Sequence, residues 1–115
     1  MTEPQHTDAA FTGEAELEAL GELAETTVRV NRVTFQPGAR THWHSHAGGQ
    51  LLHAVSGHGL MQEQGQAVVR FAAGDTVSTA PGVEHWHGAV DDETMVHIAV
   101  SGGVTDWGGP AADAR

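Results

Sequence analysis

The sequence predicts an all-β fold, an antiparallel sandwich or barrel. Fifteen glycines are dispersed through the 115 residues, with short apolar runs between them. Many tight turns joining short strands are typical of this class. About eight strand candidates recur at intervals of roughly 8–12 residues. This spacing favours a closed or double-sheet architecture, because such an arrangement hides the strand edges.

The strand candidates are runs in which β-branched and alternating residues dominate, and glycine, proline or aspartate separates them. They cover residues 27–35, 41–46, 50–55, 59–63, 67–71, 76–79, 84–89 and 94–100. In the first candidate the alternation slips between Val30 and Val33. The slip predicts a β-bulge near Asn31 and Arg32.

The segment between Gly13 and Glu25 is ambiguous. Leu17, Leu20 and Ala24 lie at helical spacing, but Gly21 interrupts the run. The segment is therefore compatible with a helix and also with an irregular extended arm.

The length predicts one domain with a single core. We place this β-domain at residues 11–107, between a polar, frayed tail at 1–10 and a Gly- and Ala-rich tail at 108–115. In the C-terminal region Trp107 is the only plausible anchor. The N-terminus has no signal-peptide pattern and no 18 apolar residues run together, so a cytoplasmic location is expected.

Charge and cysteine content exclude several classes of function. Five basic residues face 15 acidic ones, giving a formal charge of -10. We therefore expect no nucleic acid or membrane partner, since both require a basic surface. Without cysteine there is no disulfide or thiolate nucleophile. Any metal must be bound by His, Gln, Glu or Asp.

A candidate metal site is formed by His44, His46, Gln50 and His85. In a strand, successive side chains alternate between faces, so His44 and His46 would project from one side, roughly 7 Å apart. A divalent first-row metal accepts neutral imidazole nitrogens, and three protein ligands with open positions describe a catalytic site. Gln50 could instead be a hydrogen-bond partner of a ligand.

These residues resemble the two motifs of the cupin superfamily. The first motif matches Gly38-x5-His44-x-His46-x3-Gln50-x6-Gly57, and the second matches Gly74-x6-Pro81-Gly82-x2-His85. The resemblance implies a single-domain, jelly-roll-type antiparallel β-barrel with a metal inside. Gln50 stands where the usual ligand is Glu, and the Asn that often closes the second motif is absent. A neutral donor set leaves the ion its full charge, which makes it a stronger Lewis acid that is held less tightly.

A longer set of segments is similar to the bacterial, manganese-dependent cupin hydroxynitrile lyases of the (R)-mandelonitrile lyase type. The similarity extends from Phe11 to Trp107 and includes 33–41, 43–44, 49–50, 81–82, 85–89 and 106–107. It implies one divalent transition metal per chain, preferably Mn, with Fe, Co, Ni or Zn as alternatives. It also implies a homo-oligomer, a dimer or tetramer, in which the N-terminal segment crosses to a neighbouring subunit.

Three further histidines are candidates for catalysis. His97 falls where the lyases have their proposed base, although a histidine on the Met95, His97 and Ala99 face could also be a satisfied core residue. His87 has the parity of His85 and should face the pocket, where it could hold a substrate oxygen. His42 shares a face with His44, so it either looks into the cavity or is solvated.

The remaining histidines and two tryptophans are expected to have structural or surface roles. They are His6, His53, His58, Trp43 and Trp86. Trp43 and Trp86 are adjacent to ligands but have the wrong parity to join them, so we expect packing residues that flank the site.

Three functions fit this site. The leading hypothesis is a hydroxynitrile lyase that cleaves or forms small α-hydroxynitriles, with the metal as Lewis acid and His97 as general base. A non-heme Fe or Mn dioxygenase acting on a small phenolic or diketone substrate is the alternative. A non-catalytic cupin that binds a small molecule is the third.

Overall fold

The computed structural model describes residues 10–111. Apart from one 3-10 turn, η1 (Ala24–Thr26), the regular structure of these residues is β-strand, which confirms the all-β prediction. The strands are β1 (Phe11–Thr12), β2 (Ala15–Leu23), β3 (Val28–Phe35), β4 (Arg40–Thr41), β5 (His44–His46), β6 (Gln50–Ser56), β7 (His58–Glu63), β8 (Val69–Ala72), β9 (Thr76–Thr79), β10 (His85–Ala89), β11 (Met95–Gly102) and β12 (Thr105–Trp107).

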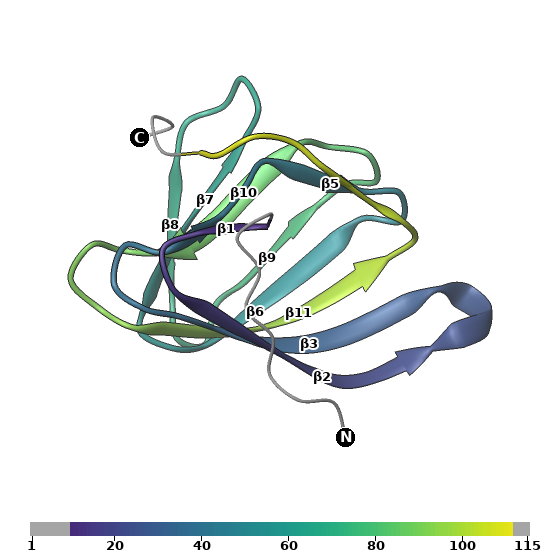
Figure 1. Cartoon of the computed structure of the whole chain (residues 1–115), viewed down its shortest axis with the longest axis horizontal. Coiled ribbons are helices and arrows are strands. Elements are labelled where there is room, and N and C mark those ends of the chain that lie inside the picture. The colour runs from purple at the N-terminus through teal and green to yellow at the C-terminus, as the bar shows by residue number, and fades with distance from the viewer. Residues whose placement is uncertain (1–9, 112–115) are drawn as a thin grey trace.

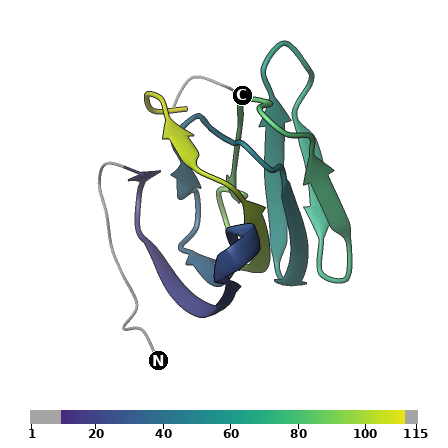
Figure 2. The same ribbon diagram turned by 90° about the vertical axis from the view of Figure 1, so that its right-hand side faces the viewer.

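The strands form two antiparallel sheets. The five-stranded sheet has the order β2-β3-β11-β6-β9. The seven-stranded sheet has the order β1-β4-β10-β5-β12, with β7 added on β10 and β8 on β7. In Figures 1 and 2 the strands of both sheets curve around a common interior. Side chains from the two inner faces meet there and form the core.

The core is apolar in one part and rich in histidine in another. Phe35 and Met95 are completely buried and Leu52 is 2% exposed. Along β11 every second residue is buried, beginning with Met95, and His97 and Ala99 follow on the same face. This face of β11 therefore lies against the interior.

The ambiguous segment before residue 25 is a strand rather than a helix. β2 pairs with β3 from Ala15 opposite Phe35 to Leu23 opposite Val28. A short isolated helix is marginal in water, whereas the backbone of a strand here gains a full ladder of hydrogen bonds. Pairing with β3 therefore overrides the helical spacing of the leucines.

The bulge predicted within β3 near Asn31 and Arg32 is wrong. The ladder between β3 and β11 runs in unbroken register from Phe35 to Val28. The irregularity lies in β2, where the register shifts between Ala19 and Gly21. β2 is an edge strand, so an extra residue there disturbs one ladder, whereas the same residue in β3 would disturb two.

The single strand expected at 41–46 is divided into β4 and β5, which lie one after the other alongside β10. His42 and Trp43 leave the ladder between them, and their N–H groups donate to the carbonyls of Ala10 (2.7 Å) and Gly109 (2.9 Å). At Gly88 of β10 the approach to β4 is so close that a Cβ would lie 2.3 Å from the carbonyl oxygen of Ala39.

The described residues next to both chain ends are buried or hydrogen-bonded to the β-domain. Residues 1–9 and 112–115 lie outside the described part, so the tail predicted at 1–10 is described only at Ala10, which is buried. In the predicted tail at 108–115, the N–H of Gly108 donates to the Trp43 carbonyl (2.7 Å). Arg40 donates to the carbonyl of Ala111 (3.0 Å). Within residues 10–111 no helix has the length and hydrophobicity to span a membrane.

Candidate metal centre and its cavity

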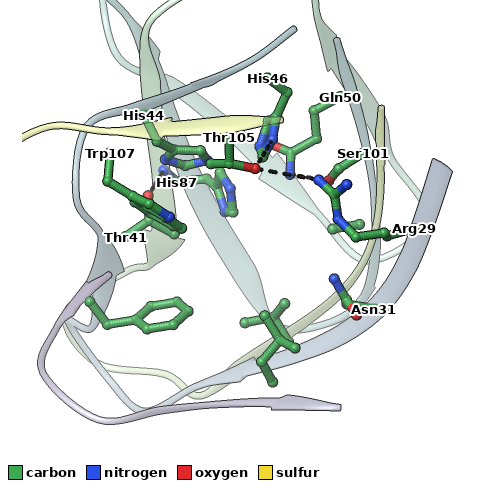
Figure 3. A pocket seen from close by; sticks show the side chains of 14 residues that line it. Arg29, Asn31, Thr41, His44, His46, Gln50, His87, Ser101, Thr105 and Trp107 are labelled. Carbon is green, nitrogen blue, oxygen red and sulfur yellow. Dashed lines mark hydrogen bonds between the residues drawn. The ribbon is translucent and has the colours of Figure 1, made fainter. Parts of the chain in front are cut away.

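The four predicted ligands converge on the inner faces of β5, β6 and β10. His44 lies directly opposite His85 across the β5–β10 ladder, and their ring centroids are 4.3 Å apart. The ring of His46 lies 4.9 Å from that of His44. All three imidazoles and Gln50 are buried. Figure 3 shows His44, His46 and Gln50 grouped on one side of a pocket.

Two of the imidazoles are oriented by backbone carbonyls. His44 Nδ1 lies 2.8 Å from the carbonyl oxygen of His42, and His85 Nδ1 lies 3.0 Å from that of Val83. A carbonyl oxygen only accepts hydrogen bonds, so Nδ1 must carry the proton in both rings. The neutral rings therefore present a bare lone pair at Nε2, which is the form that binds a metal.

The other two predicted ligands are held by hydroxyl groups. His46 Nδ1 lies 2.9 Å from Thr105 Oγ1, and His46 Nε2 is buried with no hydrogen-bond partner among the described residues. Gln50 Nε2 donates to Ser101 Oγ (2.9 Å), which leaves its Oε1 turned to the site. Each candidate ligand thus has one atom engaged and one available.

The contact between His85 and Gln50 supports a bound cation. His85 Nε2 lies 2.8 Å from Gln50 Oε1. Burial lowers the pKa of His85, so a second proton on this ring is disfavoured and two lone pairs face each other. A positive ion between these atoms would remove the repulsion. The residues present therefore fit a metal.

The electrostatics also suit neutral imidazole ligands. Burial, followed by the charge of His85, lowers the pKa of His44 to about 3. The same two causes, in the same order, lower the pKa of His46 to about 4. Both rings are neutral at pH 7, so they need not lose a proton to bind a cation.

His87 is a second candidate for the third imidazole ligand. Nitrogen atoms of His44, His85 and His87 lie within 4.8 Å of one another, and His46 is outside this group. The partners of the two rings differ, however. His46 Nδ1 meets a hydroxyl oxygen, whereas His87 Nδ1 lies 3.0 Å from Nε2 of His97.

His87 and His97 form a buried imidazole pair. His87 Nε2 and His97 Nδ1 have no hydrogen-bond partner in the described part of the chain. Burial lowers the pKa of His97 to about 4, and burial together with His97 lowers the pKa of His87 well below its usual value. Phe35 packs against both rings, at 5.2 Å from His97 and 6.0 Å from His87.

A cavity of about 160 Å³ adjoins the predicted ligands. His44, His46, Gln50 and His87 line it, whereas His97 and His42 do not. His97 therefore meets the cavity only through His87. The alternation used to place His42 fails because the chain leaves the strand between β4 and β5.

Sequence reasoning did not place seven polar or aromatic residues in the wall of this cavity. They are Phe11, Arg29, Asn31, Thr41, Ser101, Thr105 and Trp107. Parity could have found three of them, since Arg29 and Asn31 share a face with Val33, and Ser101 shares one with His97. Nothing local places Thr105 or Trp107 in the cavity wall. Figure 3 shows Trp107 on one side of the pocket and Arg29 on the other.

The residues expected to be structural lie away from this cavity. His53 is exposed and pairs with Thr76, and His58 pairs with Glu93 at 2.9 Å. Trp86 is completely buried under the guanidinium of Arg40, as expected for a packing residue. His6 lies outside the described residues.

Comparison with known proteins agrees with the fold. A cupin domain model matches residues 31–101. The chain is 39% identical over 102 residues to an (R)-mandelonitrile lyase of Granulicella tundricola, covering 84% of this chain and 78% of that protein. It also matches the crystal structure of a cupin-like protein from Thermotoga maritima, with a TM-score of 0.89 and 40% identity, over 95% of this chain and 86% of the other.

A more distant structure shares the fold alone. It is a predicted oxalate decarboxylase from Thermotoga maritima, with a TM-score of 0.76 and 22% identity, over 88% of this chain and 92% of that one. The match of the domain model and the extent of the identity to the lyase together establish the family. The chain belongs to the cupin domain family, and its fold is the cupin β-barrel.

Proposed function

We propose that this cupin is a metal-dependent hydroxynitrile lyase that cleaves and forms small α-hydroxynitriles. The observation that carries the proposal is the 2.8 Å approach of His85 Nε2 to Gln50 Oε1, beside a buried imidazole pair. A cation site next to a proton acceptor is what such a cleavage requires. The 39% identity to an (R)-mandelonitrile lyase supports the choice of reaction.

His44, His46, Gln50 and His85 would hold one divalent ion, with manganese preferred on the resemblance to the lyases. When bound, the ion supplies Lewis-acid stabilisation of negative charge on a substrate oxygen. The protein supplies a set of neutral donors, so none of the ion's charge is cancelled by a carboxylate.

The proton is handled by His87, with His97 behind it. His87 Nε2 takes the proton from the substrate hydroxyl, the oxygen's electron pair forms the carbonyl, and the C–C electron pair leaves with cyanide. His87 then returns the proton to cyanide, giving hydrogen cyanide. His87 Nδ1 and His97 Nε2 lie 3.0 Å apart. In the proposal His87 carries its proton on Nδ1 and donates it to His97 Nε2, which would stabilise the positive charge that forms on His87.

This assignment places the contact with substrate at His87 and not at His97. His87 lines the cavity and has a free Nε2, whereas His97 is completely buried and does not line it. His97 then acts through His87 as a positioning residue. His42, which does not line the cavity, has no role in the proposal.

Mandelonitrile cleavage, followed by the release of benzaldehyde, tests the reaction. Manganese-loaded wild type should be active and the metal-stripped protein inactive. His87→Ala should lose about 10²–10⁴-fold in kcat, the usual contribution of a general base. His53→Ala is the control, since it removes an exposed histidine far from the cavity. A stripped protein as active as the loaded one would refute the lyase proposal.

Metal content separates the two ligand sets. Elemental analysis of protein purified without added metal should show one metal per chain in wild type and in His87→Ala, and little in His46→Ala. The opposite result would make His87 a ligand and remove it as the base. The same measurement on wild type identifies the native metal.

The homo-oligomer belongs to the proposal as well. β2 is an edge strand, and its Leu20 and Leu23 are 44% and 66% exposed. An exposed edge with apolar side chains favours pairing with a second copy. Sedimentation of wild type and Leu23→Lys tests this: the variant should dissociate, and equal masses would contradict a contact at this edge.

A further inference from the structure

Arg29 is a cation in the cavity wall that the proposed reaction does not use. It lies on β3, where residues 29, 31 and 33 share one face of the strand. Arg29, Asn31 and Val33 all line the cavity. In Figure 3 Arg29 and Asn31 lie on the same side of the pocket, and Trp107 lies on the opposite side.

The guanidinium is fixed close to the predicted metal ligands. Its Nη1 donates to the carbonyl of Gly103 (2.9 Å), and more weakly to that of Thr27 (3.5 Å). Its Nη2 donates to Thr105 Oγ1 (3.3 Å), the same oxygen that holds His46. A guanidinium has five N–H donors in a rigid fork, so donors remain for a ligand.

No acidic side chain forms an ion pair with Arg29 within residues 10–111; Glu22, its neighbour across the β2–β3 ladder, is exposed and makes no ion pair with it. The ion pairs there join Arg32 to Glu18 and His58 to Glu93. No Asp or Glu lines the cavity, although the chain has 15 acidic residues. A half-buried cation without a counter-ion is costly, and an anionic ligand would supply the missing charge.

We propose that the cavity binds small molecules that carry a carboxylate, and that Arg29 pairs with this group with the help of Asn31. One planar guanidinium and one amide match a planar monoanion, whereas a phosphate usually meets several cations. For the substrate, the inference rests on the proposed function: the hydroxynitrile or its aldehyde carries an acid group directed to Arg29, away from the Trp107 side.

Titration of the manganese-loaded protein with benzoate and with neutral benzamide tests the inference. Benzoate should bind wild type, and Arg29→Gln should weaken it about tenfold or more, the effect of losing a charge-assisted hydrogen bond. Arg32→Gln is the matched control, because Arg32 lies on the same strand but is exposed and paired with Glu18. Benzamide should bind wild type more weakly than benzoate does, and it should bind wild type, Arg29→Gln and Arg32→Gln with equal affinity.

Two further arms make the result independent of the metal and of turnover. The titrations are repeated on metal-stripped proteins, in which benzoate can contact only side chains, and the same loss in Arg29→Gln is expected. Where lyase activity is found, Arg29→Gln should lower kcat/KM for carboxybenzaldehyde more than for benzaldehyde, whereas Arg32→Gln should change neither. Absence of turnover would count against the proposed function alone, since binding is measured separately.

Three outcomes would overturn the inference. They are benzoate failing to bind wild type, benzoate binding Arg29→Gln as tightly as wild type, and benzamide losing affinity in Arg29→Gln by the same factor. An equal loss for benzamide would show that Arg29 affects the shape of the cavity and does not recognise the negative charge of the ligand.

Discussion

Replacing Thr105 by valine should weaken metal binding although Thr105 is not a ligand. Thr105 Oγ1 lies 2.9 Å from Nδ1 of His46 and also accepts from Arg29 at 3.3 Å. Valine keeps the branched shape that suits strand β12 but cannot accept a hydrogen bond. Binding a metal through Nε2 requires the proton of His46 to be on Nδ1, which then needs an acceptor. His46 is 6% exposed, so water cannot take the place of the hydroxyl.

The size of the effect follows from that unpaired donor. A buried donor without an acceptor costs about 1–3 kcal/mol. His46 can avoid this cost by moving its proton to Nε2, but Nε2 is then blocked as a ligand. We therefore expect manganese affinity to fall about 10–100-fold, in line with other residues that orient metal ligands.

Competition with a chelator of known affinity measures the change. The matched control is Thr76→Val, because His53 Nδ1 meets Thr76 Oγ1 at the same 2.9 Å but in an exposed position. Water can replace that hydroxyl, so this variant should bind manganese as wild type does. If Thr105→Val also binds as wild type does, or if both variants weaken equally, then Thr105 does not orient a ligand.

Three other predictions concern the ligand Gln50, the packing at Gly88 and the dependence of stability on pH. Gln50→Glu should bind manganese more tightly and cleave mandelonitrile more slowly, because a carboxylate cancels part of the ion's charge; equal rates would contradict a Lewis-acid role. Gly88→Ala should lower the free energy of unfolding in urea by about 1–3 kcal/mol, because its Cβ would meet the Ala39 carbonyl, while Gly21→Ala, with open space around it, should stay within about 0.5 kcal/mol. The metal-free protein should lose stability as the pH falls from 6.5 toward 4, because the lowered pKa values of His44 and His46 leave only the unfolded chain able to take up protons. The free energy of unfolding should fall by about 1.4 kcal/mol per pH unit for each histidine. Denaturant titrations at several pH values measure this slope, and a free energy that does not change with pH would contradict the prediction.

The strands and the candidate ligands could be predicted because their signals are local. Runs of β-branched residues ending at glycine or proline placed the strand 76–79 correctly, and most others to within two residues. The spacing of His44 and His46 required only the alternation of one strand. The same reasoning failed at His42, because the strand is interrupted there and side chains no longer alternate between the two faces.

Arg29 shows where parity alone falls short. Arg29 lies on the same face of β3 as Val33. A strand face that carries both a charged and an apolar residue does not indicate that the charged residue lines a cavity. Its role depends on Thr105, which is 76 residues away and reaches Arg29 only because β12 pairs with β5. No local pattern in the chain carries that information.

The sequence by itself determined the all-β class, the strand spacing and the grouping of His44, His46, Gln50 and His85, because each follows from periodicity or motif spacing within a short stretch. Only the tertiary structure decided that His97 meets the cavity through His87, that Thr105 and Ser101 hold the candidate ligands, and that Arg29 stands in the wall without a carboxylate partner. The physical reason is that these contacts form only when the two sheets close around a common interior. This closure brings residues that are far apart in the chain into contact, and it decides which face of each strand is buried from water.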